Sequence, residues 1–221
     1  MKFIGILLSI AILVSCQPQQ KQGTRTQSDE TSKEEVAVNM EDFKEYFQRV
    51  TLTADTFHIH HYRWATGDED FKGQLIVQKI LKQYVDSTIF KANFDEEYFA
   101  IAYIKQIDAF LIRTRMSEAD HMQQLFLLNY NADKQAFTSA TKVASFFGAE
   151  GFINQMASWI VPNNNTYQVF MRNSNWSIDV VNETETETDS IRTYIFDNHQ
   201  FTPKSTVKTS KALKKQFPLV D

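Results

Sequence analysis

Three closely spaced histidines are the residues of this sequence best suited to chemistry. They stand in the run His58-Ile59-His60-His61, within residues 51–64, a stretch rich in Thr and aromatic residues that favours an extended conformation. Alternate side chains of a strand share a face, so His58 and His60 would point together and His61 away. The spacing therefore predicts a pair of imidazoles on one side of a strand.

Such a pair could supply half of a Zn²⁺ or Cu²⁺ site, because neutral imidazole is a common ligand of both ions. A third ligand would have to come from elsewhere in the chain, for example His121, His199 or a carboxylate. The alternative is a strand whose histidines are solvated or hydrogen-bonded. Because H-x-H alone is a weak signal, His58 and His60 are only weak metal candidates, and we expect no metal or other cofactor.

A second pattern is the alternation of glutamate and threonine at residues 183–188, with Glu183, Glu185 and Glu187 in every other position. On a strand the three carboxylates would line one face and repel one another, which Ca²⁺ could relieve. The Asp/Asn/Gly spacing of the known Ca²⁺ loops is missing. A polar hairpin tip explains the run equally well, because water screens the charges there.

No motif for covalent catalysis or nucleotide binding is present. The sequence lacks a G-x-S-x-G elbow, a P-loop, a G-x-G-x-x-G fingerprint and an H-E-x-x-H helix. Scattered carboxylates near predicted strand ends, Glu96, Glu97, Asp108 and Glu118, leave open an envelope hydrolase acting on glycan or peptide. A convergent pair of buried acids in a cleft would support that alternative. We expect no catalytic residues.

The N-terminus has the features of an export signal. Lys2 is followed by an apolar run over residues 3–14, well short of the ~20 residues that span a bilayer. The run ends in Leu13-Val14-Ser15-Cys16, which resembles the lipobox of bacterial lipoproteins. The resemblance implies that residues 1–15 are a signal peptide and that Cys16, the sole cysteine, becomes the lipidated first residue of the mature chain.

The same resemblance implies a location. In the sorting rule of enteric lipoproteins an Asp after the cysteine retains the protein at the inner membrane, and here the residue is Gln17. We therefore expect a lipid anchor in the outer membrane, on the periplasmic face, since no acidic residue that would favour the cell surface stands within residues 17–20. The expected partners are the membrane, through the lipid, and an envelope protein or glycan.

Composition divides the chain into a tether and one globular domain. Residues 17–35 contain no apolar side chain, so residues 16–35 are predicted to be the lipidated cysteine and a disordered tether. Residues 36–221 are predicted to form a single domain. The net charge of −4 gives no electrostatic reason to expect nucleic acid binding. Once Cys16 is acylated, no thiol remains for disulfides or thiol chemistry.

Periodicity predicts an α+β fold that is rich in β structure. Residues 40–50 and 71–85 repeat apolar side chains at three and four positions, which predicts two N-terminal helices. Beyond them, short runs of β-branched and aromatic residues predict an antiparallel meander of about eight strands, in a curved sheet or barrel. The predicted strands are residues 98–106, 109–116, 123–130, 135–143, 156–161, 167–173, 176–181 and 191–197.

The links between these strands are predicted from turn-forming residues. Ile107 and Asp108 are short enough for a hairpin turn, which would place Ala102 and Ile104 opposite residues near 111–113. Residues 145–151, which hold two glycines, are predicted to be a loop, and residues 173–175 a turn. Residues 210–216 are either a short surface helix or part of a loose tail.

The leading functional hypothesis is a non-catalytic binding module on a tether. The chain contains 18 Phe, 8 Tyr and 3 Trp, and aromatic faces suit sugars and apolar ligands. Packing of the core is the alternative use of these side chains. We therefore expect a protein similar to the small envelope lipoproteins of Gram-negative bacteria, which binds a protein, a glycan or a small apolar ligand.

Overall fold

The structure is a computed structural model that describes residues 39–52, 55–60, 73–92, 96–116, 119–164, 166–197 and 199–219. For residues 116 and 119–122 it describes the backbone alone. The predicted signal peptide, Cys16 and the tether lie outside the described residues, as does His61.

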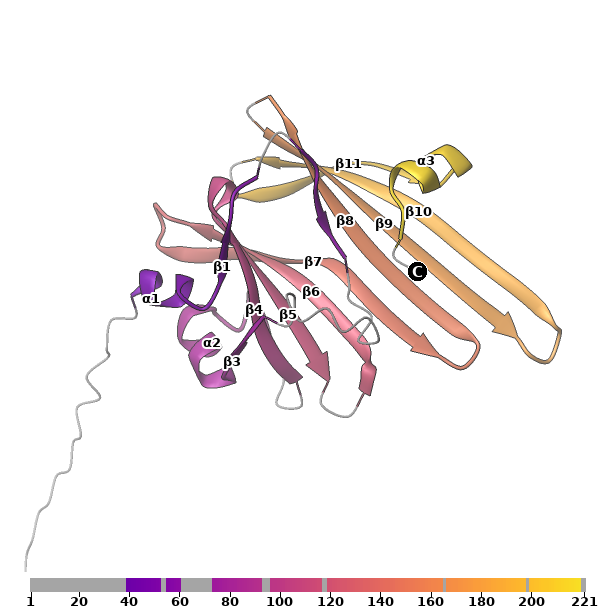
Figure 1. The fold of residues 1–221 in the computed structure, drawn as a ribbon, viewed down its shortest axis with the longest axis horizontal. Coiled ribbons are helices and arrows are strands. Elements are labelled where there is room, and N and C mark those ends of the chain that lie inside the picture. Colours follow the sequence, from indigo (N-terminus) through magenta and orange to yellow (C-terminus); the bar gives the residue numbers. More distant parts are fainter. Residues whose placement is uncertain are drawn as a thin grey trace, which may run out of the picture. The chain divides into compact units, whose positions relative to one another are not determined.

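Eight consecutive strands form an antiparallel meander (Figure 1), which confirms the predicted fold class. The sheet is open, with β1 at one end of the strand order and β11 at the other. The meander consists of β4 (Glu96–Ile104), β5 (Ala109–Met116), β6 (Ala119–Asn131), β7 (Ala136–Ala149), β8 (Phe152–Asn163), β9 (Thr166–Asp179), β10 (Thr184–Asp197) and β11 (Gln200–Lys208).

Two predictions within the meander are wrong and one strand was not predicted, and strand pairing explains all three differences. The expected turn at residues 173–175 is the middle of β9, where Asn173 pairs with Met156 of β8 and with Ser190 of β10. The expected loop at 145–151 is strand as far as Ala149, since β7 pairs there with β8. The strand β11 was not predicted. In each case ladders on neighbouring strands outweigh local turn propensity.

The first hairpin turn is wider than predicted. A single 3₁₀ turn, Lys105–Ile107, precedes Asp108, which has a positive φ of 45°. As a result Ala102 lies opposite Leu111, as expected, but Ile104 lies opposite Ala109. A register shift between Ala100 and Ala102 adds one residue to β4 at this point.

Both predicted N-terminal helices are shorter than their periodicity indicates. The helix α1 (Met40–Lys44) ends early, and β1 (Gln48–Val50) then pairs in parallel with residues 102–104 of β4. The second region divides into β3 (Gln74–Ile76), which pairs with β4, and α2 (Gln78–Tyr84). Segments with a helical residue pattern thus form strands here, because backbone groups along the edge of β4 offer them hydrogen bonds. Residues 71–72 lie outside the described residues.

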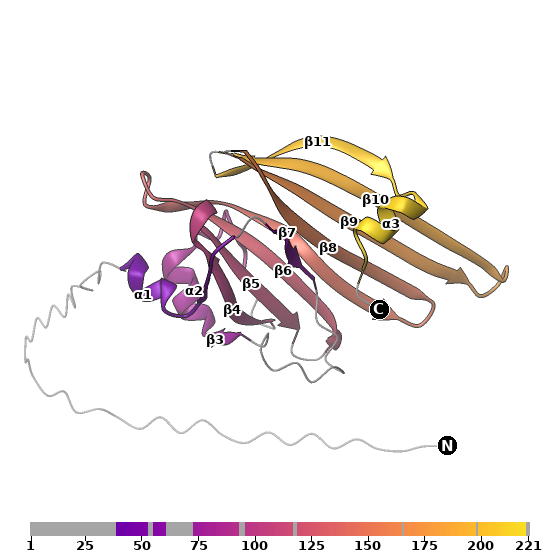
Figure 2. The same ribbon diagram turned by 45° about the horizontal axis from the view of Figure 1, so that its top comes forward.

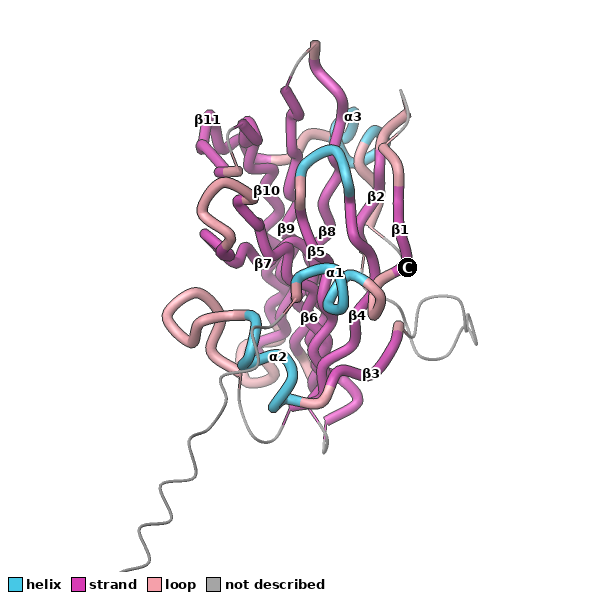
Figure 3. Tube along the Cα trace, turned by 90° about the vertical axis from the view of Figure 1, so that its left-hand side faces the viewer, coloured by secondary structure: helices cyan, strands magenta, loops and turns pink. Residues whose placement is uncertain are grey.

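The helices α1 and α2 cover one face of the β4–β6 region, as Figures 2 and 3 show. Beneath them lies an aromatic cluster centred on Phe110, which is fully buried and contacts the rings of Phe43, Phe47 and Phe137. A second cluster joins the two halves of the sheet, because Leu111 and Leu125 pack in it with Ile160 of β8 and Val169 of β9.

The strand β2 (Phe57–Ile59) pairs with Ser158–Ile160 of β8, next to the segment of β8 that pairs with β7. Only residues 51–56 join β1 to β2, and residues of both strands line one cavity, so the strand on the edge of β4 and the strand on the edge of β8 lie near each other. Within the described residues β1 and β2 share no ladder. We call the gap between these two strands the seam.

The C-terminal helix α3 (Lys211–Gln216) confirms the helical alternative for residues 210–216. Its N-cap Ser210 accepts a hydrogen bond from the amide of Leu213. Phe217, which follows the helix, packs with Trp159 and Phe170 in a third apolar cluster. None of the helices in the described part of the chain is long and apolar enough to cross a membrane.

Candidate functional site: a cavity at the seam

A cavity of about 120 Å³ lies between β1 and β2, above the face of the β4–β6 region. Seven of its lining residues are apolar and three are polar but uncharged when histidine is neutral. The lining residues are Val50, Phe57, Ile59, Ile101, Ala102, Leu111 and Leu125, together with Gln48, His58 and His60. We call this space the seam cavity.

Strand alternation separates the two kinds of side chain on β2. Ile59 is 2% exposed and packs in the cluster beneath the cavity, and Phe57 packs against the same cluster. His58, between them, pairs with Trp159 across the ladder. Alternate positions face opposite sides, so one side of β2 forms the apolar wall and the other carries imidazoles.

The predicted pairing of the two imidazoles is confirmed. The ring centroids of His58 and His60 are 4.5 Å apart, and the ring of His58 stacks on Trp159 at 4.7 Å. Burial, followed by the charge of the neighbouring His60, lowers the pKa of His58 to about 4. Burial also lowers the pKa of His60. Both imidazoles are therefore neutral at pH 7.

This arrangement makes stability depend on pH. In the unfolded chain His58 takes up its proton near its ordinary pKa of 6.5, and in the folded chain only near pH 4. The fold is therefore penalised progressively as the pH falls through this window, and unaffected above it. Because His58 is partly exposed, we expect a loss of about 1–2 kcal/mol.

Chemical denaturation at pH 7 and at pH 4.5 measures this effect. The variant His58→Phe keeps a ring on Trp159 but cannot take up a proton, so its loss between the two pH values should be smaller than that of the wild type. Equal losses in the two proteins would show that His58 does not titrate in this window.

The structure gives the two metal hypotheses no further support. No group of three or more His, Cys, Asp or Glu that could hold a metal ion occurs in the part of the chain that is described. His199 lies in the turn between β10 and β11, and the side chain of His121 is outside the described residues. Of the glutamates, Glu183 is in a turn with φ 52°, and Glu187 forms an ion pair with Lys214.

The carboxylates considered for hydrolysis have separate neighbours. Glu97 accepts two hydrogen bonds from Arg115, Glu96 accepts one from the hydroxyl of Tyr98, and Asp108 accepts one from the hydroxyl of Tyr103. Among the described residues the one buried acid is Asp189, which is paired with Arg172. Glu118 lies outside the described residues.

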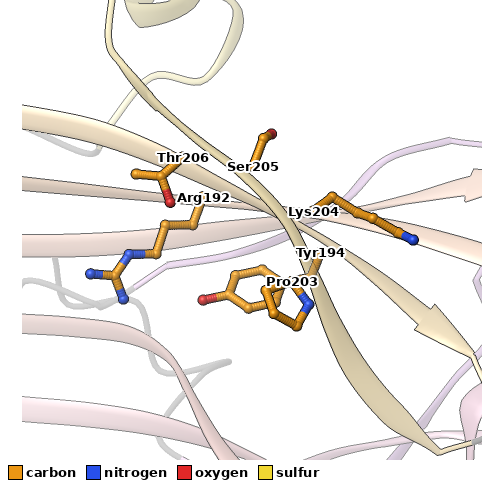
Figure 4. A pocket seen from close by; sticks show the side chains of 6 residues that line it. All are labelled: Arg192, Tyr194, Pro203, Lys204, Ser205 and Thr206. Atoms are coloured by element: carbon orange, nitrogen blue, oxygen red, sulfur yellow. The ribbon is translucent and has the colours of Figure 1, made fainter.

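A second, larger hollow of about 480 Å³ lies over β10 and β11 (Figure 4). It is lined by Arg192, Tyr194, Pro203, Lys204, Ser205 and Thr206. In Figure 4 the side chain of Lys204 extends away from that of Arg192, so the two cations do not converge on one point. The seam cavity is thus the better-defined candidate site.

Only one wall of the seam cavity could be predicted from the sequence. The histidine run marked β2, but Leu111, Leu125 and Ala102 look like ordinary core positions of a meander. Their place at a cavity depends on β1 and β2 binding to the edges of two distant strands, β4 and β8. Pairing between strands so far apart in the chain cannot be predicted from a local residue pattern.

Comparison of the chain with protein-family models, with curated proteins and with solved structures finds no match. The function must therefore be argued from the site and the sequence.

Proposed function

We propose that this protein is a non-catalytic lipoprotein of the cell envelope, held at the outer membrane by a lipid on Cys16, whose β-rich domain binds a small apolar ligand. The observation that carries the binding role is the seam cavity. A cavity with an apolar lining and a few polar groups at its margin is the usual form of a small-ligand site. Its volume of about 120 Å³ suits a group the size of one aromatic ring.

The position of the cavity supports ligand entry. It lies where β1 and β2 share no ladder in the described structure, so parting them would break no hydrogen bonds between these two strands. Each of them has only three residues. Movement of a three-residue strand disturbs fewer hydrogen bonds than movement of any strand of the meander.

Binding can be tested with toluene as an apolar probe. Titration of methyl-labelled protein should shift the NMR signals of Ile59, Leu111 and Leu125, which line the cavity. The variant Ala102→Leu adds an isopropyl group to the lining and should weaken toluene binding at least tenfold. Ala136→Leu makes the same change at an exposed position of β7 and should leave it unchanged. Equal binding by the two variants would contradict the proposal.

The anchor is tested separately in cells. The wild-type protein should partition with membranes and incorporate a labelled fatty acid, because the thiol of Cys16 is the acceptor that the lipobox resemblance implies. Cys16→Ala should lose the label. Firm attachment needs two lipid chains or more. Because Cys16→Ala would carry none, this variant should also leave the membrane fraction. Labelling of both proteins would refute the anchor.

A further inference from the structure

The alternation of glutamate and threonine at residues 183–188 separates charge between the two faces of β10. This strand pairs with β9 without a register shift, so its alternate side chains lie on opposite faces along its whole length. Glu185, Glu187 and Asp189 share one face. Lys214 of α3 contacts two of these carboxylates, so theirs is the face on which α3 lies. The residues between the acids therefore project from the other face.

That other face of β10 carries hydroxyl groups, and its partners on β9 and β11 extend it. The positions that share a face across these ladders, which we call the polar face, are Asn175, Thr188, Ser190, Arg192, Thr206 and Lys208. Asn175 donates to the hydroxyl of Thr188 at 3.3 Å, which confirms that these two side chains lie together. From Thr186 to Phe196, no residue of β10 on this face is acidic, nor is any residue paired with one of them on β9 or β11.

Two cations of the polar face have no opposite charge beside them. The side chains of Arg192 and Lys208 are exposed, and none of the ion pairs in the described structure involves either of them. They are diagonal neighbours, because Lys208 pairs with Ser190, two positions before Arg192. Long side chains reach each other across such a diagonal. An anionic ligand would supply the charge that the face lacks.

The hollow of about 480 Å³ over β10 and β11 gives this charge a place to act, since Arg192 and Thr206 line it. Figure 4 shows the guanidinium of Arg192 and the hydroxyl of Tyr194 extending in the same direction. The volume is in the range of small-molecule sites. A guanidinium binds a carboxylate through two parallel hydrogen bonds, and a phenolic hydroxyl can donate a third. The hollow thus suits a carboxylate that belongs to a larger molecule.

We propose that the polar face binds an acidic glycan, a sugar chain that bears carboxylates, with one carboxylate on the guanidinium of Arg192. The hydroxyl groups of Thr188 and Ser190 both donate and accept hydrogen bonds, and so match the hydroxyl groups of the sugars. A neutral glycan would leave the cations without a partner, and an acidic peptide would leave the hydroxyl groups unused. The polar face shares no residue with the seam cavity, so this inference goes beyond the proposed function and does not depend on it.

Tetramers of galacturonate, glucuronate and mannuronate are suitable probes, and the methyl ester of each is the uncharged control. They are titrated into the ¹⁵N-labelled full chain and followed by NMR. At least one acidic tetramer should shift the amide signals of Ser190, Arg192 and Thr206. Its methyl ester should bind about tenfold more weakly, because it cannot form the charged contact with the guanidinium. Added salt should weaken the binding of the acidic form.

Two pairs of variants locate the contact. Arg192→Gln should weaken the tetramer about tenfold, while Arg49→Gln, at an exposed arginine on β1, should leave its affinity unchanged. Thr188→Val replaces a hydroxyl by a methyl on the polar face and should weaken the tetramer about threefold. Thr193→Val makes the same change on the opposite face of β10 and should have no effect.

Three results would overturn the inference. If no acidic tetramer binds, or if the methyl esters bind equally well, the face does not recognise an acidic glycan. If Arg192→Gln and Arg49→Gln weaken binding equally, the attraction is not located at the polar face. If tetraglutamate binds more tightly than every acidic tetramer, the ligand is an acidic protein segment.

Discussion

Arg172→Ala should lower the free energy of unfolding by about 3 kcal/mol. The guanidinium of Arg172, 7% exposed, donates to both carboxylate oxygens of Asp189, at 3.0 and 2.7 Å. It also donates to the carbonyl of Phe217 at 2.6 Å, and so fixes the segment after α3. Alanine would leave Asp189 buried without its principal partner. The loss should fall at the low end of the range for buried pairs, because Lys214 and Thr209 still contact this carboxylate.

Chemical denaturation gives the free energy, and tryptophan fluorescence reports the release of the C-terminus. The ring of Phe217 is 5.1 Å from that of Trp159, so the emission of Trp159 should change when Arg172 is replaced. Arg192→Ala, an exposed arginine on β10, is the matched control and should cost less than about 0.5 kcal/mol. The double variant Arg172→Met/Asp189→Leu should recover part of the loss, since apolar residues can replace a buried ion pair.

The ion pair between Arg172 and Asp189 also makes stability depend on pH, through the carboxylate of Asp189. Burial acts to raise the pKa of Asp189, but hydrogen bonds from Arg172 and Thr209, followed by the charge of Arg172, outweigh burial and hold the pKa below its ordinary value of 3.8. The pair therefore contributes stability above that value, and this stability is lost as the pH falls through the lower folded-state pKa. An Arg172→Ala effect that persisted unchanged in strong acid would contradict the assignment to an ion pair.

Phe110→Ala should cost about 4 kcal/mol, because it removes a whole ring from the centre of a packed cluster. Phe110 is fully buried, and the cluster connects α1 to β5, β6 and β7. The rings in contact with it are Phe43 at 5.5 Å, Phe47 at 5.0 Å, Tyr103 at 4.7 Å, Tyr130 at 6.4 Å and Phe137 at 5.4 Å.

Two further variants show how far the effect depends on the lost volume and on the position of the ring. Phe110→Leu keeps most of the volume and should cost about 1.5 kcal/mol. Phe201→Ala removes the same ring atoms from a partly buried position on β11, and its effect should be clearly smaller than that of Phe110→Ala. Thermal unfolding followed by circular dichroism ranks the three proteins. Similar melting temperatures for Phe110→Ala and Phe201→Ala would contradict the central role of Phe110.

The meander could be predicted from the sequence because each of its strands has a recognisable local residue pattern. In β4 and β5 apolar and β-branched residues form runs of strand length, and polar residues separate them, so strand type follows from pattern. The prediction failed where distant partners decide the structure. Leu75 and Ile76 fit a helical face, yet they form β3 because β4 offers an unpaired edge. Asn173 and Asn175 resemble turn residues, yet neighbours on both sides hold them in β9.

The candidate site was predicted only in part, for the same reason. The spacing of His58 and His60 indicates a shared side of a strand, and their rings are indeed close. The stack on Trp159 depends on β2 pairing with β8, about one hundred positions further along the chain. The one-residue irregularity between Ala100 and Ala102 has no signature in the sequence, although it sets which residues of β4 face the cavity.

The register shift between β10 and β11 should reduce association between copies of the protein at high local concentration. An exposed strand edge invites pairing with another copy, and the lipid anchor proposed above would raise the local concentration of copies. The strand β11 ends the sheet, and its register against β10 shifts between Thr193 and Tyr194, opposite Lys204. Pro203 lacks an amide hydrogen to donate, and Lys204 adds a charge. A second copy would therefore meet an interrupted edge, which disfavours the growth of the sheet from one molecule into the next.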